Sequence, residues 1–184
     1  LQAAEDLFLE KGYEDVTLEE IAALAGVTRG AVHWHFKNKR ALLDGLAEAM
    51  LLEKHTHSFP KPDDDWRSFL IGNAHSFRRA LLAYRDGARI HAGTRPNEPQ
   101  FDMAETQLRF LCERGFAPAD AVHALMTISY YAVGSVLEEQ AGEVDAHERR
   151  TTKSNPSSTT PFLTAAMRDL ENAGPDAAFE YGLT

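Results

Sequence analysis

Apolar residues recur along this chain with the spacing of α-helices, and polar or turn-forming residues separate the helical stretches. Apolar positions three and four residues apart lie on one face of a helix. The pattern predicts helices over residues 1–10, 39–57, 64–84, 88–92, 100–114, 118–143 and 161–172, a further helix from 176 onward, and a polar loop over 145–161. We find no clear alternation with the period of two that marks a strand, so we expect an all-α fold.

The segment 16–40 contains two helix starts in close succession. Thr17 followed by Glu20 has the form of a capping box, in which each side chain satisfies the other's backbone N–H. Gly26 can end this first helix in the left-handed conformation, and Thr28 is a good N-cap for a second helix. Two short helices joined by a turn that contains glycine are typical of a helix-turn-helix.

Charge supports this interpretation. The chain has 19 Lys and Arg against 28 Asp and Glu, a formal net charge of −9, yet residues 28–40 contain four cations, two histidines and no acid. Cations at the groove supply most of the non-specific affinity for DNA. We expect Arg29 to read a base and Lys39 and Trp34 to contact phosphate or pack. The residues expected at the DNA are Thr17, Glu19, Thr28, Arg29, Gly30, Ala31, His33, Trp34, His35 and Lys39. The alternative is a helical hairpin in an unrelated bundle.

Composition narrows the classes of protein to which this chain could belong. The chain has one cysteine and no run of 18 apolar residues, so we expect a cytoplasmic protein without a membrane span. It starts at Leu1 rather than Met and stops at Thr184 soon after a new helix begins, so we expect both ends to be truncated. No metal-binding or nucleophile motif stands out, which argues against an enzyme. Composition alone leaves the function of the core open.

Residues 5–45, with AEDLFLEKGYEDVT before the motif and WHFKNKRALLDGL after it, resemble the N-terminal domain of the tetracycline-repressor (TetR) family of transcriptional regulators. The resemblance implies a helix-turn-helix domain over residues 1–38 and a ligand-binding and dimerisation core over 39–184. It also implies a homodimer that binds a palindromic operator in double-stranded DNA and releases it when a small-molecule inducer binds.

Residues 80–101, 105–116 and 133–140 resemble the members of this family that bind tetracycline as a chelate with Mg²⁺. The resemblance implies a metal held directly by His91 and, through waters, by Thr94 and by Glu138 of the partner subunit. The residues expected at the ligand are His55, Asn73, Phe77, His91, Thr94, Arg95, Pro96, Gln100, Met103, Gln107, Leu108, Val122, Leu125, Leu163, Met167 and Leu170.

The match departs from these members at several positions. Met103 and Ala104 stand where smaller lining residues are expected, and Tyr130 replaces a histidine, so the shape of the cavity does not follow from the resemblance. The DNA-binding segment departs more and looks closer to other multidrug regulators of the family. Its operator sequence therefore does not follow either.

Three hypotheses result. The first is a repressor released by a tetracycline–Mg²⁺ inducer. The second is a repressor of the same architecture that responds to another aromatic or polycyclic ligand without a metal. The third is a helical protein that does not bind DNA, or an enzyme on the same scaffold.

Overall fold

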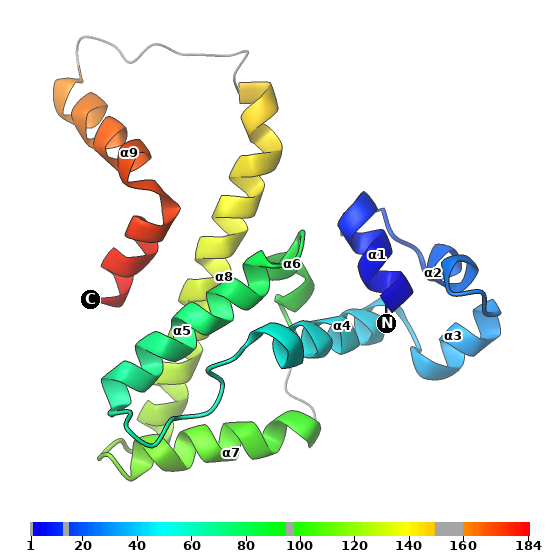
Figure 1. The fold of residues 1–184 in the computed structure, drawn as a ribbon, viewed down its shortest axis with the longest axis horizontal. Coiled ribbons are helices and arrows are strands. Elements are labelled where there is room, and N and C mark those ends of the chain that lie inside the picture. The colour runs from blue at the N-terminus through cyan, green and yellow to red at the C-terminus, as the bar shows by residue number, and fades with distance from the viewer. Residues whose placement is uncertain (1, 13–14, 95–97, 150–159) are drawn as a thin grey trace. The chain divides into compact units, whose positions relative to one another are not determined.

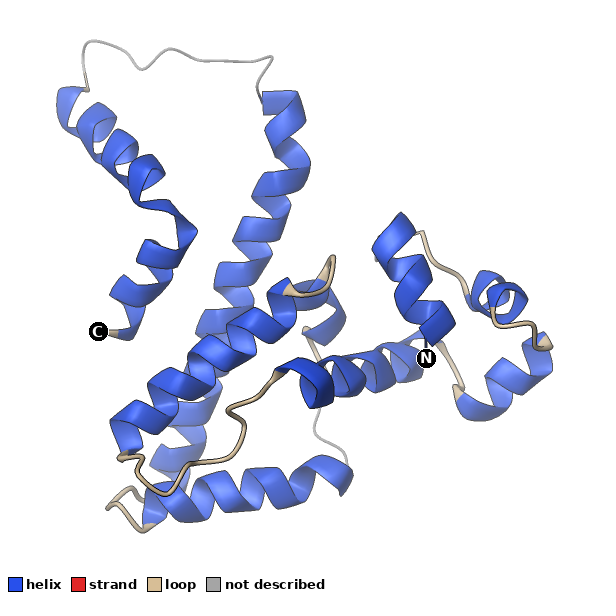
Figure 2. Cartoon of the chain, in the orientation of Figure 1, coloured by secondary structure: helices blue, strands red, loops and turns tan. Residues whose placement is uncertain are grey.

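The computed structural model of this chain describes residues 2–12, 15–94, 98–149 and 160–184 (Figure 1). Every regular element in these ranges is a helix, which confirms the predicted all-α class (Figure 2). The helices are α1 (Gln2–Lys11), α2 (Leu18–Leu24), α3 (Arg29–His35), α4 (Lys39–Lys54), α5 (Trp66–Leu82), α6 (Gly87–His91), α7 (Glu98–Cys112), α8 (Pro118–Arg149) and α9 (Pro161–Leu183).

The chain divides into two compact units, residues 1–137 and residues 138–184, with the division inside α8. The first unit holds α1 to α7 and most of α8. In it α1 packs on α2, α2 packs on α3, and α4, α5 and α6 pack on one another. The second unit holds the end of α8 and α9. The boundary that the sequence predicts between residues 38 and 39 stays a prediction.

The two helix starts of the segment 16–40 have the predicted capping geometry. The Glu20 N–H donates to Thr17 Oγ1 over 3.3 Å, and the Thr17 N–H donates to Glu20 Oε2 over 3.0 Å, which completes the capping box. Gly26 has φ of +65°, a region that glycine enters without steric cost. Thr28 Oγ1 then accepts the Ala31 N–H over 3.2 Å and starts α3.

Two helix ends differ from the prediction, one because of a long-range contact and the other because of the local sequence. The pattern predicts that α4 continues to residue 57, but it ends at Lys54, and the side chain of His55 turns to bond with Ser76 of α5. The predicted loop over 145–161 is wrong at its start, since α8 continues to Arg149. This part of the chain has no proline and is rich in Glu, Ala and Arg, which favour helix.

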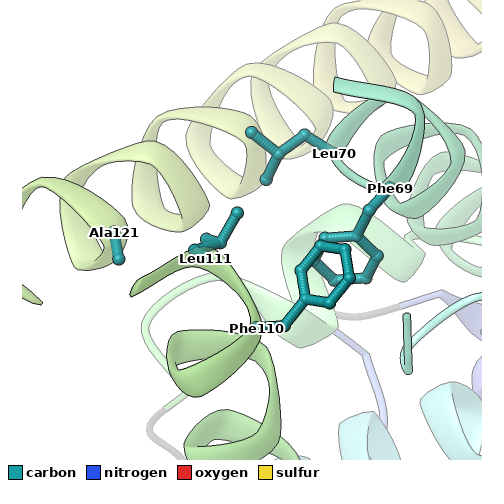
Figure 3. Packing of buried hydrophobic residues seen from close by; sticks show 5 residues of the cluster. All are labelled: Phe69, Leu70, Phe110, Leu111 and Ala121. Carbon is teal, nitrogen blue, oxygen red and sulfur yellow. The ribbon is translucent and has the colours of Figure 1, made fainter. Parts of the chain in front are cut away.

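Part of the core of the first unit is an apolar cluster contributed by α5, α7 and α8 (Figure 3). The rings of Phe69 and Phe110 meet edge to face with their centroids 5.1 Å apart, an arrangement that aromatic pairs prefer. Leu111 and Ala121 are fully buried beside them. The cluster fixes α5, α7 and α8 relative to one another, and these helices carry much of the cavity wall.

In the second unit, α9 is broken where the sequence predicts a break. Gly174 has φ of +78° and ψ of +174°, which is not helical, and Pro175 follows it. Proline has no N–H and clashes with the preceding turn, so a continuous helix cannot pass through this position.

Candidate functional site

The exposed face of α3 presents the residues expected at the DNA. The side chains of Arg29 and Trp34 are 66% and 82% exposed, and His33 and His35 are also exposed. Gly30 and Ala31 at the start of α3 leave its backbone open to close approach. A helix that offers a cation, an indole and small residues on one open face suits the major groove.

Arg29 is held in place from two sides. Its Nη2 lies 2.9 Å from Glu19 Oε1 at the start of α2, and its Nε donates to His33 Nε2 over 3.4 Å. Arg29 and Glu19 stay exposed, so the guanidinium is oriented but open to solvent. Thr17 and Thr28 are also exposed, and both cap helices, while Lys39 is half-buried at the start of α4.

A cavity of about 500 Å³ lies within the first unit, and it is bounded by α4, α5, α6, α7 and α8. Sequence reasoning and the structure agree on eleven of its lining residues: His55, Asn73, Phe77, His91, Thr94, Gln100, Met103, Gln107, Leu108, Val122 and Leu125. A cavity of this size, mostly apolar with a few polar groups, is typical of a small-molecule site.

The other residues of the predicted set lie outside the described ranges or in the second unit. Arg95 and Pro96 lie outside the described residues. Leu163, Met167 and Leu170 belong to α9 of the second unit, where they are 59%, 46% and 51% exposed. Glu138 also belongs to the second unit and is exposed.

Sequence reasoning missed part of the lining. Asp44, Ala47, Glu48 and Leu51 of α4 line the cavity, as do Met126 and Ser129 of α8. Ala104 of α7, which stands where the sequence analysis expects a lining residue, also lines it. The α4 residues have the three- and four-residue spacing of one helix face, and Met126 and Ser129 lie four and seven positions after Val122. Helical periodicity from residues already assigned to the cavity is therefore the signal that could have found them.

One wall of the cavity contains the histidine expected to bind the metal. Thr94 Oγ1 donates to the His91 carbonyl oxygen over 2.7 Å and lies 3.4 Å from His91 Nδ1. The ring of Phe77 meets the His91 ring edge to face at 5.0 Å. Burial, and after it the positive charge of Arg40, lowers the pKa of His91 to about 4. The imidazole is therefore neutral at neutral pH, the form that binds metals.

Few groups near His91 could bind a metal. Within the part of the chain that the structure describes, no three His, Cys, Asp or Glu residues gather as a metal site. One imidazole and one nearby hydroxyl suit Mg²⁺ only if waters or ligand oxygens complete its octahedron. The residues therefore fit a metal that enters together with a chelating ligand.

The polar edge of the cavity is formed by His55 and Asn73. Burial lowers the pKa of His55 to about 4, so this ring is also neutral at neutral pH. Gln107 Nε2 donates to the Ser58 carbonyl oxygen over 2.6 Å and ties α7 to the loop after α4.

Two contacts connect the cavity region to the helices at the start of the chain. Arg40 near the start of α4 donates to the carbonyl oxygen of Ala92, the residue after His91. Arg85 after α5 donates to the carbonyl oxygen of Glu10 in α1 over 2.9 Å. Arg40 therefore joins the end of α6 to α4, and Arg85 joins the turn before α6 to α1.

Comparison with known families agrees with the assignment of a DNA-binding region and a ligand cavity. Residues 1–46 match the model described as bacterial regulatory proteins, tetR family, and residues 59–184 match the model described as tetracyclin repressor-like, C-terminal domain. The chain belongs to the TetR family. Its family consists of transcriptional regulators, which confirms the prediction of a DNA-binding regulator rather than an enzyme.

Individual relatives are also similar over the full chain. The tetracycline repressor protein class A from transposon 1721 of Escherichia coli is 63% identical over 183 residues, which are 100% of this chain and 84% of that protein. A solved structure of TetR class A with 5a,6-anhydrotetracycline and magnesium is 55% identical, with a TM-score of 0.79, over 99% of this chain and 90% of the other.

A TetR variant from Acinetobacter baumannii AYE, solved in complex with minocycline, has a TM-score of 0.81 and 50% identity over 99% of this chain and 88% of the other. Within the described ranges of this TetR-family chain, none of the helices has the length and apolar character needed to cross a membrane.

Proposed function

We propose that this TetR-family regulator is a repressor whose inducer is a tetracycline bound together with Mg²⁺. The observation that carries the proposal is the cavity of about 500 Å³, with neutral His91 and Thr94 on one wall and neutral His55 and Asn73 at its polar edge. Relatives whose structures were solved with anhydrotetracycline and magnesium and with minocycline support the same ligand class.

In this proposal His91 would hold the metal directly, and Thr94 and Glu138 of the partner subunit would hold it through waters. A metal held there would neutralise the negative charge of the drug's keto-enolate oxygens. The apolar side chains of Phe77, Leu108 and Val122 cover the flat faces of the rings. Arg95 and Pro96, and Leu163, Met167 and Leu170 of α9, remain proposed ligand contacts.

The DNA partner is a palindromic operator that the homodimer reads with two copies of α3, placed one DNA turn apart, about 34–36 Å. Arg29 contacts a base edge, and Lys39 contacts phosphate. Because its operator is chromosomal or plasmid DNA, the repressor works in the cytoplasm.

Release of the operator requires that the ligand favour a state that cannot bind DNA. A change from 99:1 to 1:99 in the DNA-competent state needs a differential affinity of about 5.5 kcal/mol. A ligand beside His91 displaces α6, and the Arg40 contact passes this displacement to α4 and so to the DNA-reading helices. The metal chelate supplies several charge-assisted contacts that are present in only one state.

The test is a titration of the complex between the protein and its operator, where the operator sequence is first selected from random DNA. We expect tetracycline with Mg²⁺ to release the DNA and EDTA to restore it. Release that is unaffected by EDTA would favour the second hypothesis, a ligand bound without metal. No binding to any selected DNA would contradict the repressor function itself.

A further inference from the structure

Folding places an acid, Glu19, on the DNA-reading face. Residues 28–40 contain four cations and no acid, yet Glu19 Oε1 of α2 lies 2.9 Å from Arg29 Nη2 of α3. The Glu19 side chain is 53% exposed, so its charge stays on the same open surface as the guanidinium. A carboxylate on a surface that meets phosphates weakens binding to every DNA sequence by charge repulsion. Its presence there therefore has a reason other than affinity.

Helix stability does not supply that reason. An acid in the first turn of a helix interacts favourably with the helix dipole, but Glu20 already stands in the same turn of α2. The Glu20 carboxylate accepts the Thr17 N–H and pairs with Lys11 Nζ over 2.6 Å. An exposed ion pair such as that between Glu19 and Arg29 contributes little to folding. What Glu19 does change is the orientation of the Arg29 side chain.

Two contacts decide which nitrogens of Arg29 are open to DNA. A guanidinium carries five N–H hydrogens in a planar fork. Nε donates to His33 Nε2 over 3.4 Å, and Nη2 pairs with Glu19. Among the described residues, neither of these contacts uses Nη1. Both Nη1 hydrogens and one Nη2 hydrogen therefore remain for a partner outside the chain, and the side chain is 66% exposed.

A fork held in this way matches one base better than the others. Guanine presents two acceptors, O6 and N7, in the major groove, whereas adenine presents one acceptor beside a donor. Cytosine presents a donor, and thymine presents a single acceptor beside a methyl group. An arginine that is free to turn can instead bind a phosphate, which every sequence offers. Restraint of Arg29 therefore favours guanine over phosphate.

We propose that Glu19 is a positioning residue that sets operator specificity by holding Arg29 for a guanine in each half-site. The proposal rests on the proposed operator binding and adds the base that Arg29 reads. It has two consequences of opposite sign. Glu19 strengthens the preference for guanine through Arg29, and its negative charge weakens binding to DNA of any sequence. A residue that served only the fold would not separate these two effects.

The experiment measures base preference with the full chain. An operator is selected from random DNA with the wild type, and affinities are then measured for its single-base replacements. The base pair at which Arg29→Ala loses its preference is the one that Arg29 reads. We expect the wild type to prefer guanine there about five- to 150-fold. Glu19→Ala should reduce this preference about two- to fivefold. The same variant should bind a non-specific duplex more tightly than the wild type does.

Asp15→Ala is the matched control, because it removes an exposed acid from the same region of the chain. Asp15 lies four positions before Glu19, and its charge acts on Lys11. This variant should keep the full guanine preference of the wild type. If Asp15→Ala and Glu19→Ala reduce the preference equally, net charge is the cause, and the proposal is wrong. Urea unfolding of both variants checks that each remains folded.

A double variant shows whether Glu19 acts through Arg29. In the Arg29→Ala background, Glu19→Ala should leave base preference unchanged. A further change would mean that Glu19 contacts a base itself, which contradicts a positioning role. Operator binding without guanine at the Arg29 base pair, or a full guanine preference in Glu19→Ala, would overturn the proposal and leave the repressor function intact. Absence of binding to any selected DNA would contradict both.

Discussion

The guanidinium of Arg40 donates a hydrogen bond from Nη1 to the carbonyl oxygen of Ala92 over 3.1 Å. The same side chain donates from Nε and Nη2 to Asp44 Oδ1 over 2.9 and 2.7 Å, so its position is fixed on α4. Ala92 ends α6 and follows His91. One residue thus joins the helix that leaves the DNA-reading region to the helix that carries the expected metal ligand.

Arg40→Gln should reduce the coupling between ligand and operator. We expect the free variant to bind the operator and tetracycline with Mg²⁺, but the ligand should lower DNA affinity about five- to thirtyfold less than in the wild type. The measurement is a thermodynamic cycle: the affinity for the operator with and without ligand, and the affinity for the ligand with and without operator.

Lys54→Gln is the control for that cycle, since it removes the same charge from the other end of α4, where Lys54 contacts the adjacent Glu53. Its coupling should match that of the wild type. If Arg40→Gln couples ligand binding to operator release as the wild type does, the hydrogen bond to Ala92 does not contribute to that coupling.

Arg29→Ala should weaken binding to the selected operator by about 1–3 kcal/mol and relax the preference at one base pair of each half-site. The exposed cation Lys37 is the control, because a phosphate contact carries no base preference. Lys37→Ala should weaken binding to all sequences alike and reduce the salt dependence. An equal loss of affinity for all DNA sequences in Arg29→Ala would show that Arg29 also contacts only phosphate.

Glu19→Gln removes the exposed ion-pair partner of Arg29. It should lower the free energy of unfolding by less than about 1 kcal/mol.

Stability should fall as the pH is lowered from about 6.5 to 5. His55 and His91 have folded pKa values of about 4, below the ordinary histidine value of about 6.5, so both rings stay neutral in the folded chain and gain a proton on unfolding. Each such proton lowers the free energy of unfolding by about 1.4 kcal/mol per pH unit. Urea unfolding at several pH values measures this slope.

The variants His55→Gln and His91→Gln should each reduce that slope by the equivalent of one proton, and the double variant by two. Above pH 7 the histidine contribution should not change with pH, because both states are neutral there. A slope that the two substitutions leave unaltered would show that these rings are not buried as neutral groups.

Gly72→Ala should destabilise the first unit. A Cβ at Gly72 would lie 2.5 Å from the His57 ring, which is bonded through Nε2 to Asp64 Oδ2 at 2.9 Å. The ring must move, so we expect a loss of about 1–3 kcal/mol in the free energy of unfolding. Gly30→Ala is the control, because a Cβ there meets only Thr28 Oγ1 at 3.8 Å. That variant should be neutral or slightly stabilising in urea unfolding.

Local interactions made much of this protein predictable. Capping by Thr17 and Thr28, the turn at Gly26 and the break at Gly174 each involve residues within a few positions of one another, and the structure has all of them. The periodic apolar positions likewise predicted the helical class. The cavity residues were predicted through a family resemblance, since no local pattern marks them as neighbours.

The sequence by itself determined the helices and the two-helix DNA-reading motif, because caps, turns and helix faces depend on residues that are adjacent along the chain. Only the tertiary structure decided that α4 ends at Lys54 and that Ser76 supports His55. Arg40 and Ala92 are 52 positions apart. Contacts of this kind arise when helices pack, and no periodicity along the chain encodes which faces will meet.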